Sequence, residues 1–511
     1  MQNHGLGAWL PKRRQTTPEK VALVYGEGRE MTFLQLAEFT DAMSGLLHQH
    51  GVSKGDRVAF IGENCPEFLM TLFGCAQLGA VFVPINTRLA PPEIEHVLAD
   101  SGTTVLVHGP DFSDTVAELA ERAGVRHRLQ TGEEGSDGMP GLRPLLRAGT
   151  RGHVDTAVTL DDPAMIMYTS GTTGKAKGAV LTHGNLTWVS INTALDYDLV
   201  SRDIALLISP LFHAAALGMG ALPLVLKGAT IVLEQGFDAG RALGLIGRYR
   251  ITSLSGVPTT YQLMADHESW DHTDLSSLTK LTCGGSAVPS RILDAYERRG
   301  LSFSQGYGMT ETSPGASYLR PERSREKQGS VGVGHFFTDV RITDAETGTV
   351  VPRGTVGEIE VRGPNVFVGY HGLPEATEQA FTPDGWFRSG DLGYLDSDGY
   401  LFIADRLKDM IISGGENIYP AEIEDHLNSM EGVTGAAVIG VPDEQWGEVG
   451  WAILTVREGV DQATVSTAAV KAALDGKLAR YKIPKRVIVV DEFPRTASGK
   501  IRKADLRARF A

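Results

Sequence analysis

Residues 168–178 of the chain read Tyr168-Thr169-Ser170-Gly171-Thr172-Thr173-Gly174-Lys175-Ala176-Lys177-Gly178. They follow a short apolar segment, residues 164–167, that is typical of a buried strand. Three glycines allow the backbone N–H groups to turn toward an anion, and the hydroxyl groups and two lysines add donors and positive charge. The composition therefore predicts a phosphate-binding loop that begins where a strand ends.

The loop is not of the Walker A type. That pattern requires a glycine five residues before Gly174 and a serine or threonine after Lys175, and the sequence has Thr169 and Ala176 there. A solvated turn rich in glycine and threonine is the alternative interpretation. We favour the phosphate loop because hydroxyl, lysine and glycine residues are so concentrated in it.

Segments on both sides of the loop alternate between helical and strand-like patterns. Apolar residues recur at helical spacing in residues 33–51, 66–78 and 93–99. Short strand-like runs occupy residues 57–61, 80–84 and 104–108, and similar runs recur at 204–209, 230–233 and 279–284. This alternation predicts mostly parallel sheets with helices on their faces.

The pattern changes after residue 330. Short strands at 340–342, 357–362 and 400–403 are separated by Gly, Pro and Asp and predict a small β-rich subdomain over residues 330–405. A charged run, Asp405-Arg406-Leu407-Lys408-Asp409, then separates two apolar strands. We predict a mixed α/β (α+β) fold, with a large N-terminal domain over 1–405, a hinge at 406–408 and a small C-terminal α/β domain over 409–511.

Composition restricts the functions open to the chain. Its 511 residues suggest roughly two to four domains, and 42% hydrophobic and 22% charged residues are ordinary for a globular protein. The formal net charge of −14 disfavours nonspecific nucleic-acid binding. Arginines 241, 248 and 250 with residues 12–14 would form a basic patch for weak peripheral membrane contact, although a solvated charge cluster is the simpler interpretation.

Cysteine content and the N-terminus indicate a cytoplasmic protein. The three cysteines, Cys65, Cys75 and Cys283, are odd in number and form no CxxC motif, which favours a reducing compartment. The basic residues 12–14 precede polar residues instead of the apolar run of a secretory signal. Two uncharged stretches, 68–87 and 204–226, contain glycines and prolines, so we expect helices and strands joined by turns in place of membrane spans.

The loop and four further motifs resemble the adenylate-forming superfamily of acyl- and aryl-CoA synthetases, adenylation domains and luciferases. These motifs, in chain order, are Gln305-Gly306-Tyr307-Gly308-Met309-Thr310-Glu311, Ser389-Gly390-Asp391-Leu392-Gly393, Asp405-Arg406-Leu407-Lys408-Asp409 and Pro494-Arg495-Thr496-Ala497-Ser498-Gly499-Lys500. Within the superfamily, residues 406–420 and 84–89 are most similar to bacterial medium- and long-chain fatty-acyl-CoA synthetases.

The resemblance implies ATP, Mg²⁺ and coenzyme A as reactants and cofactor. It places the nucleotide on residues of the loop and of the adenylate and ribose motifs, namely Thr169, Ser170, Gly171, Thr172, Thr173, Gly174, Lys175, Gly284, Gly285, Ser286, Gly306, Tyr307, Gly308, Asp391 and Arg406. Tyr307 would stack on adenine, or it is a core tyrosine. Residues 284–286 would let backbone approach adenine, or they form a plain turn. Asp391 would accept hydrogen bonds from both ribose hydroxyls.

Catalytic roles follow from the chemistry that the resemblance implies. A carboxylate attacks the α-phosphate of ATP, so two anions meet and the charge must be neutralised. Lys500 would span the attacking oxygen and the phosphate, Thr310 would donate to the phosphate, and Glu311 would hold Mg²⁺. Lys408 would be the hinge of a mobile C-terminal domain, and Gly414 and Gly415 would line the coenzyme A channel after rotation.

The acyl pocket is predicted around residues 210–218, which are apolar except for His213. By likeness His213 lies near the substrate carboxylate, and the expected pocket residues are Phe212, Ala214, Met309 and Trp386. A buried structural histidine and a core tryptophan are the alternatives. An amino-acid substrate is disfavoured because no acid is present to pair its ammonium group.

We therefore predict an AMP-forming acid–thiol ligase for apolar monocarboxylates, with fatty acids as the leading substrates. An aryl-CoA ligase of the 4-coumarate type and a stand-alone adenylation enzyme that loads a carrier protein are the alternatives. The expected partners are small molecules, with no nucleic acid and no transmembrane segment. A homodimer is left open.

Overall fold

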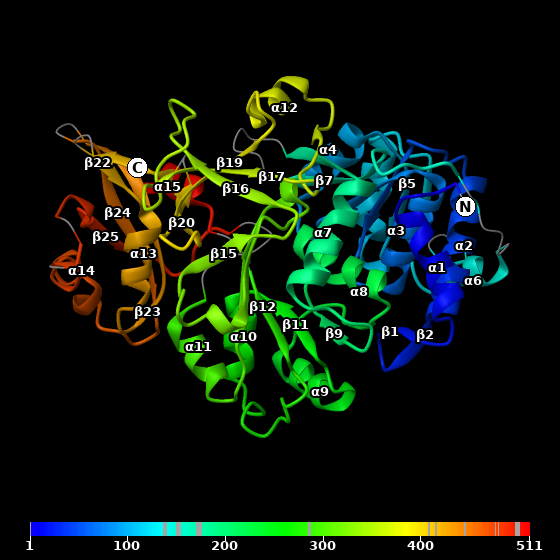
Figure 1. Ribbon diagram of the computed structural model, residues 1–511, viewed down its shortest axis with the longest axis horizontal. Helices are drawn as coiled ribbons and strands as arrows, with labels where there is room; N and C mark the ends of the chain where they lie inside the picture. Colours follow the sequence, from blue (N-terminus) through cyan, green and yellow to red (C-terminus); the bar gives the residue numbers. More distant parts are fainter. Residues whose placement is uncertain are drawn as a thin grey trace. The chain divides into compact units, whose positions relative to one another are not determined.

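The computed structural model describes the chain except for residues 1, 136–139, 150–153, 155, 170–175, 285–287, 407–408, 414–415, 444–445, 476, 479, 496–500 and 511. The chain forms two compact units. The first comprises Met1–Val340 and Val361–Phe387, and the second comprises Arg341–Glu360 and Arg388–Ala511. Figure 1 shows the elements of each unit. The predicted domain boundary at 406–408 is not tested by this division and stays a prediction.

The first unit contains a seven-stranded sheet in the order β18-β8-β7-β4-β3-β5-β6. Its strands are β3 (Arg57–Ile61), β4 (Val81–Ile85), β5 (Thr103–His108), β6 (His127–Gln130), β7 (Pro163–Thr169), β8 (Lys177–Thr182) and β18 (Gly369–Tyr370). Neighbours from β7 to β6 run parallel, whereas β8 pairs antiparallel with both β7 and β18. The predicted loop thus follows β7 at a point where the next strand returns beside it.

Three helices of the first unit occur where the sequence predicts them, namely α2 (Phe33–Gln49), α3 (Pro66–Leu78) and α4 (Pro91–Ser101). The unit also contains α5 (Ser113–Arg122), α7 (His183–Asp196) and α9 (Ala239–Tyr249). Helix α2 begins with a capping box in which Thr32 and Gln35 satisfy each other's backbone N–H groups. Every residue of α3 is buried, which explains its uninterrupted apolar run.

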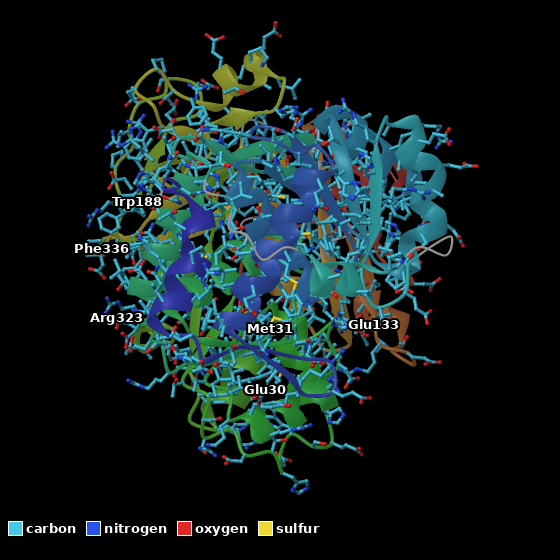
Figure 2. All side chains as sticks on the ribbon, turned by 90° about the vertical axis from the view of Figure 1, so that its right-hand side faces the viewer. Glu30, Met31, Glu133, Trp188, Arg323 and Phe336 are labelled. Carbon is cyan, nitrogen blue, oxygen red and sulfur yellow. The ribbon has the colours of Figure 1, made fainter. Side chains whose placement is uncertain are left out.

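A second sheet of the first unit carries the adenylate motif. Within the first unit, the strand order of this sheet is β15-β14-β13-β12-β11-β9-β10-β1-β2. Neighbouring strands from β13 to β1 pair in parallel. The strands are β1 (Val21–Tyr25), β2 (Arg29–Thr32), β9 (Ile204–Leu207), β10 (Thr230–Leu233), β11 (Ser253–Gly256), β12 (Lys280–Cys283), β13 (Phe303–Tyr307), β14 (Ser317–Leu319) and β15 (Ser330–Gly334). On edge strand β2, Met31 is buried while its neighbour Glu30 is exposed, as strand alternation requires (Figure 2).

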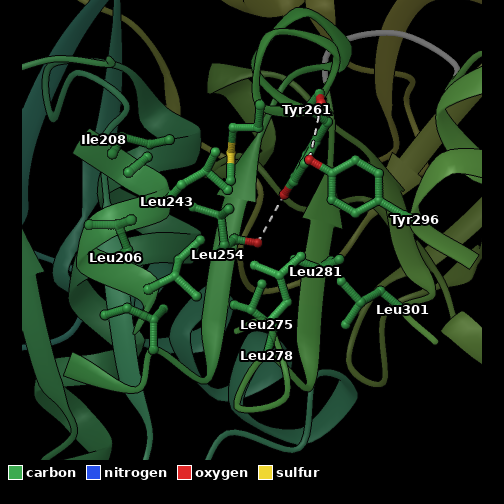
Figure 3. Close-up of a cluster of buried hydrophobic side chains, with 14 of the residues drawn as sticks. Leu206, Ile208, Leu243, Leu254, Tyr261, Leu275, Leu278, Leu281, Tyr296 and Leu301 are labelled. Carbon is green, nitrogen blue, oxygen red and sulfur yellow. Dashed lines mark hydrogen bonds between the residues drawn. The ribbon is translucent and has the colours of Figure 1, made fainter. Parts of the chain in front are cut away.

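Buried leucines and two tyrosines fill one side of this sheet (Figure 3). The Tyr261 hydroxyl donates to the carbonyl oxygens of Leu254 and Thr282, at 3.0 and 2.7 Å. The Tyr296 hydroxyl donates in turn to the Tyr261 carbonyl at 3.0 Å. The buried hydroxyls are therefore satisfied, and β11 and β12 are fixed beside β13, which leads into the adenylate motif.

The second unit contains the later strands and a small C-terminal sheet. That sheet has the order β22-β21-β24-β23, with β25 beside β24. Its elements are β21 (Ile411–Ser413), β22 (Glu416–Ile418), β23 (Val433–Asp443), β24 (Gly447–Val456), β25 (Arg486–Val489), α13 (Pro420–Asn428), α14 (Thr467–Leu474) and α15 (Lys503–Phe510). Strands β17 (Gly357–Arg362), β19 (Phe387–Leu395) and β20 (Leu401–Arg406) precede it. The predicted mixed α/β class, with large sheets and a small C-terminal sheet domain, is confirmed.

The two uncharged stretches form short elements, as expected. Residues 68–87 belong to α3 and β4, and residues 204–226 comprise β9, a π-helical turn over Ala215–Ala221 and α8 (Leu222–Lys227). Within the described parts of the chain, no helix combines the length and apolarity needed to cross a membrane. All three cysteines are free.

Three of the six residues in the predicted basic patch pair with acids. Arg241 Nη2 lies 2.9 Å from Glu234 Oε1, Arg250 binds Asp274 at 3.3 Å, and Arg14 binds Asp41 at 2.7 Å. These pairs reduce the positive field that an anionic membrane surface would meet. Peripheral membrane contact, the cytoplasmic location and a homodimer stay predictions.

Candidate active site

Two glycines of the adenylate motif pack closely against the backbone of the following segment. A Cβ atom at Gly308 would lie 1.4 Å from the carbonyl oxygen of Pro314, and one at Gly306 would lie 3.0 Å from that of Ser317. The Ala316 N–H donates to the Tyr307 carbonyl at 2.8 Å and closes the turn between β13 and β14. The motif is therefore a tight turn that no larger side chain fits at position 308.

Glu311 is held in place by a tyrosine from β18. Its side chain is buried in the turn η4 (Thr310–Thr312), and the Tyr370 hydroxyl donates to Glu311 Oε1 at 2.9 Å. Burial, and then the Glu311 carboxylate, raise the pKa of Tyr370 well above its usual value, so the hydroxyl remains a donor at physiological pH. Lys177 Nζ lies 5.3 Å from the Tyr370 ring centroid, which places the end of the phosphate segment beside this pair.

The predicted phosphate segment connects two adjacent strands. Thr169 is the last residue of β7 and Lys177 the first of β8, and the two are register partners. Ser170, Gly171, Thr172, Thr173, Gly174 and Lys175 lie outside the described residues. The residues that flank the segment, 168–169 before it and 176–177 after it, are its two stems. They therefore lie side by side in the first unit, within reach of the Glu311–Tyr370 pair.

The predicted ribose residues are neighbours in the second unit. Asp391 of β19 is 6% exposed and is the register partner of Arg406 in β20. The Asp391 N–H donates to the Ser389 hydroxyl at 3.1 Å, and the Gly390 N–H donates to Glu358 Oε1 at 3.2 Å. The structure thus brings the backbones of these two residues together, and their contact with ribose stays a prediction.

The predicted acyl segment packs against the turn that carries Glu311. Phe212 is buried, with its ring 4.6 Å from that of His213, and a Cβ at Gly218 would lie 2.3 Å from the Ser313 carbonyl. The contact is surrounded by Met165, Met167, Leu181, Leu186, Ala214, Leu217, Gly218 and Ser313, which leave no room for a water molecule between them. Residues 212–218 and 310–313, remote in sequence, therefore meet in the first unit.

Three further predicted residues, Trp386, Met309 and Gly284, have the following local surroundings. The Arg362 guanidinium lies 4.4 Å from the Trp386 ring centroid, and the Met309 N–H donates to the Thr312 hydroxyl at 3.0 Å. Gly284 directly follows β12 and has open space at its Cβ position. The roles of these three residues in the pocket and adenine site stay predictions. Gly285, Ser286, Lys408, Gly414, Gly415 and Lys500 lie outside the described residues.

Tyr370 contacts the predicted metal ligand Glu311, and sequence reasoning did not identify it. It lies 59 positions from Glu311 and carries no charge or motif that we had connected with nucleotide binding. The segment Gly369–Tyr370 is only two residues long as a strand, so its pairing with β8 has almost no signal in the pattern of apolar residues. Its proximity to Glu311 depends on that pairing.

Similarity to known proteins covers the whole chain. Residues 10–371 match the AMP-binding enzyme family, and residues 422–500 match the AMP-binding enzyme C-terminal domain. A feruloyl-CoA synthase of an Amycolatopsis species is 48% identical over 511 residues, covering 100% of both chains. The long-chain-fatty-acid–CoA ligase FadD13 of Mycobacterium tuberculosis is 36% identical over 513 residues, covering 100% of this chain and 99% of the relative.

The fold agrees with a solved enzyme structure. ATP-bound MatB from Rhodopseudomonas palustris matches with a TM-score of 0.91 and 32% sequence identity, over 99% of each chain. The predicted phosphate segment and the turn carrying Glu311 thus occur in a chain that matches a feruloyl-CoA synthase and a fatty-acid–CoA ligase over its full length. The chain belongs to the AMP-binding enzymes, the adenylate-forming superfamily, and is an ATP-dependent acyl- or aryl-CoA ligase.

Proposed function

We propose that the protein activates an aromatic carboxylic acid of the ferulate type and transfers it to coenzyme A. The observation that carries this proposal is the 48% identity to a feruloyl-CoA synthase along the entire chain, against 36% to the fatty-acid ligase. The fatty-acid substrate expected from sequence is not confirmed. It remains the second candidate, because the fatty-acid ligase also matches over the whole chain.

The acyl segment is compatible with a bulky apolar acid. Its residues Ala214, Ala215 and Ala216 have small apolar side chains, and the segment contains no acid that would pair with an ammonium group. His213 is the polar residue of this stretch, and its ring lies against Phe212. We assign His213 to the carboxylate end of the substrate, with the ring of the acid directed toward the alanines.

The reaction consists of two displacements. A carboxylate oxygen of the acid attacks the α-phosphorus of ATP, the bond to the bridging oxygen breaks, and pyrophosphate leaves. The thiolate of coenzyme A then attacks the acyl carbon, and AMP leaves with the former carboxylate oxygen. We assign Lys500 and Thr310 to the charge that develops at the α-phosphate, Asp391 and Arg406 to ribose, and the 170–175 segment to the phosphates.

Magnesium fits this site as an ion shared between protein and substrate. The described residues contain no group of three or more His, Cys, Asp or Glu side chains able to hold a metal. Mg²⁺ is commonly bound by one or two carboxylates together with substrate phosphates, which suits Glu311. When bound, the ion would neutralise phosphate charge, and Tyr370 would keep the Glu311 carboxylate in position.

The substrate proposal is tested by comparing acids in one assay. Pyrophosphate release and CoA-thioester formation are measured with ferulate, 4-coumarate, octanoate and palmitate. We expect kcat/KM for ferulate to exceed that for palmitate by about 10² or more, the size of discrimination that shape differences in an apolar pocket produce. A higher kcat/KM for palmitate would favour the fatty-acid candidate instead.

Replacing Tyr370 tests the assignment of Glu311. Tyr370→Phe removes the hydroxyl that donates to the carboxylate, a bond worth about 1.5–3 kcal/mol for a charged acceptor. We expect adenylate formation to slow by about tenfold or more, with a higher Mg²⁺ concentration needed for half-maximal rate. Tyr249→Phe, which alters a tyrosine of α9, serves as the control. An unchanged Mg²⁺ titration in Tyr370→Phe would contradict the assignment.

A further inference from the structure

We propose that helix α4 positions the phosphate-binding segment by holding both strands that flank it, through His96 and Asp100. Both residues act on the stems of the segment, so they are positioning residues. The proposal rests on the phosphate role of residues 170–175 proposed above. It assigns a function to a helix that precedes the motif by about 70 residues and contains none of the residues assigned above.

Two residues of α4, His96 and Asp100, each form a hydrogen bond with one of the two stems. The His96 Nε2–H donates to the carbonyl oxygen of Ala176 at 3.0 Å, directly after the segment. The Tyr168 hydroxyl donates to Asp100 Oδ2 at 2.6 Å, two residues before the segment begins. Residues 96 and 100 are one helical turn apart on the same face of α4. The helix therefore bridges the outgoing and the returning strand.

Tyr168 joins the two contacts into one cluster. Its ring meets the His96 ring edge to face, with centroids 6.2 Å apart and an interplanar angle of 82°. Burial, and then its hydrogen bond to Asp100, raise the pKa of Tyr168, so the hydroxyl remains a donor at physiological pH. Opposite the ring, a Cβ at Gly178 would lie 3.1 Å from Tyr168 Cζ, and the glycine leaves room for the tyrosine.

The helix itself is firmly anchored in the first unit. Ile94, Val97 and Leu98 are buried in the core cluster that also contains Ile166 of β7, and Tyr168 packs against that cluster. At the N-terminus, the Ala90 N–H donates to Glu93 Oε2 at 2.8 Å. Because α4 is fixed to the sheet, its two polar contacts fix the stems relative to the same sheet.

Such anchoring matters because phosphate loops act through backbone donors. Donors contribute to binding only when they are held near the productive geometry, and small displacements lose much of the interaction. Loss of either stem contact should therefore weaken ATP binding and leave the acid and coenzyme A steps unaffected. A residue that served only stability would affect all three substrates and the melting temperature together.

The test measures KM for ATP, the acid and coenzyme A, with the melting temperature, in single variants. His96→Leu and Tyr168→Phe each remove one stem contact and should raise KM for ATP about three- to tenfold, the range for one hydrogen bond. KM for the other two substrates should stay at wild-type values, and the melting temperature should fall by no more than the few degrees that one hydrogen bond contributes. His96→Gln retains an N–H donor, and Asp100→Asn retains an oxygen acceptor. Both variants should therefore keep KM for ATP near its wild-type value.

Two reference variants separate the explanations. Glu95→Gln alters the same helix by removing the ion pair with Arg122, 2.7 Å long, without touching a stem. Thr172→Ala tests the phosphate role of the segment itself.

A double-mutant cycle tests whether the two stem contacts are independent. Tyr168→Phe and Asp100→Ala should be strongly non-additive, because both remove the same bond. Tyr168→Phe and His96→Leu should combine nearly additively.

The outcomes distinguish failure of the helix proposal from failure of the proposed function. If Thr172→Ala raises KM for ATP but His96→Leu and Tyr168→Phe behave like Glu95→Gln, the helix does not position the segment. If Thr172→Ala also leaves KM for ATP unchanged, the phosphate role is wrong and the helix proposal fails with it. If His96→Leu does not fold, the result for Tyr168→Phe decides between the outcomes. This substitution removes a single oxygen atom and leaves the packing of the ring intact.

Discussion

Lys500→Ala is expected to lower the rate of acyl-adenylate formation by about 10²–10³, the loss that follows removal of one charged contact to the transition state. The reason is that two anions, the carboxylate and the α-phosphate, approach each other in this step. Lys500 ends the residues matched to the AMP-binding C-terminal domain. In the second step the thiolate attacks the acyl carbon and no new bond forms at the α-phosphate, so acyl-AMP supplied to the variant should still become the thioester.

Single-turnover assays of the two half-reactions measure this effect. Arg502→Ala is a matched control, since it removes a nearby cation that pairs with Asp505 at 3.2 Å and has no assigned role in the reaction. It should retain both half-reactions. Equal losses of adenylation and thioester formation in Lys500→Ala would contradict the assigned role.

Gly308→Ala should reduce adenylation by at least about 10², because displacement of reacting groups by an ångström costs that much. A Cβ at this position would lie 1.4 Å from the Pro314 carbonyl oxygen, so the backbone of the turn carrying Thr310 and Glu311 must move. The side chain that enters is small and apolar, so the effect arises from geometry and not from lost chemistry.

Gly244→Ala provides the control for this substitution. Gly244 lies in α9 with open space at its Cβ position, and alanine there should leave the rate unchanged and stabilise the helix slightly. Adenylate formation and the melting temperature are compared for both variants. A wild-type rate in Gly308→Ala would mean that the turn is not part of the catalytic geometry.

Local patterns predicted several helices and strands of the first unit with nearly the observed bounds. The helix expected over residues 33–51 occurs as Phe33–Gln49, and the one expected over 66–78 has those same bounds. Both depend on apolar spacing and on residues at the helix ends, such as Thr32 and Pro66, which act over a few positions. The motifs also predicted the family, because their order along the chain carries that information.

Contacts between remote segments could not be predicted in the same way. The bond from His96 to Ala176 joins residues 80 positions apart, and that from Tyr370 to Glu311 joins residues 59 positions apart. The division into two units is likewise discontinuous, since Arg341–Glu360 belongs with Arg388–Ala511. These arrangements depend on how strands pair, and no local pattern of apolar residues specifies a partner.

The nature of the acyl group was the least accessible feature of the sequence. The absence of an acid near Phe212 argues against an ammonium group on the substrate, but an aromatic ring and an alkyl chain are both apolar. Only the shape of a substrate pocket would separate them. The predicted pocket segment, residues 212–218, meets the turn at Ser313 about 100 positions away, and no local sequence pattern specifies that contact.

Isotope transfer from the acid to AMP tests the central claim most directly. Ferulate labelled with ¹⁸O in both carboxylate oxygens is incubated with the enzyme, ATP and coenzyme A, and the nucleotide product is analysed by mass spectrometry. Because a carboxylate oxygen attacks the α-phosphorus and leaves with AMP, we predict feruloyl-CoA together with AMP that carries one ¹⁸O atom. Formation of ADP, or of AMP without the label, would contradict an aryl-adenylate intermediate, and absence of any product from ferulate would contradict the proposed substrate.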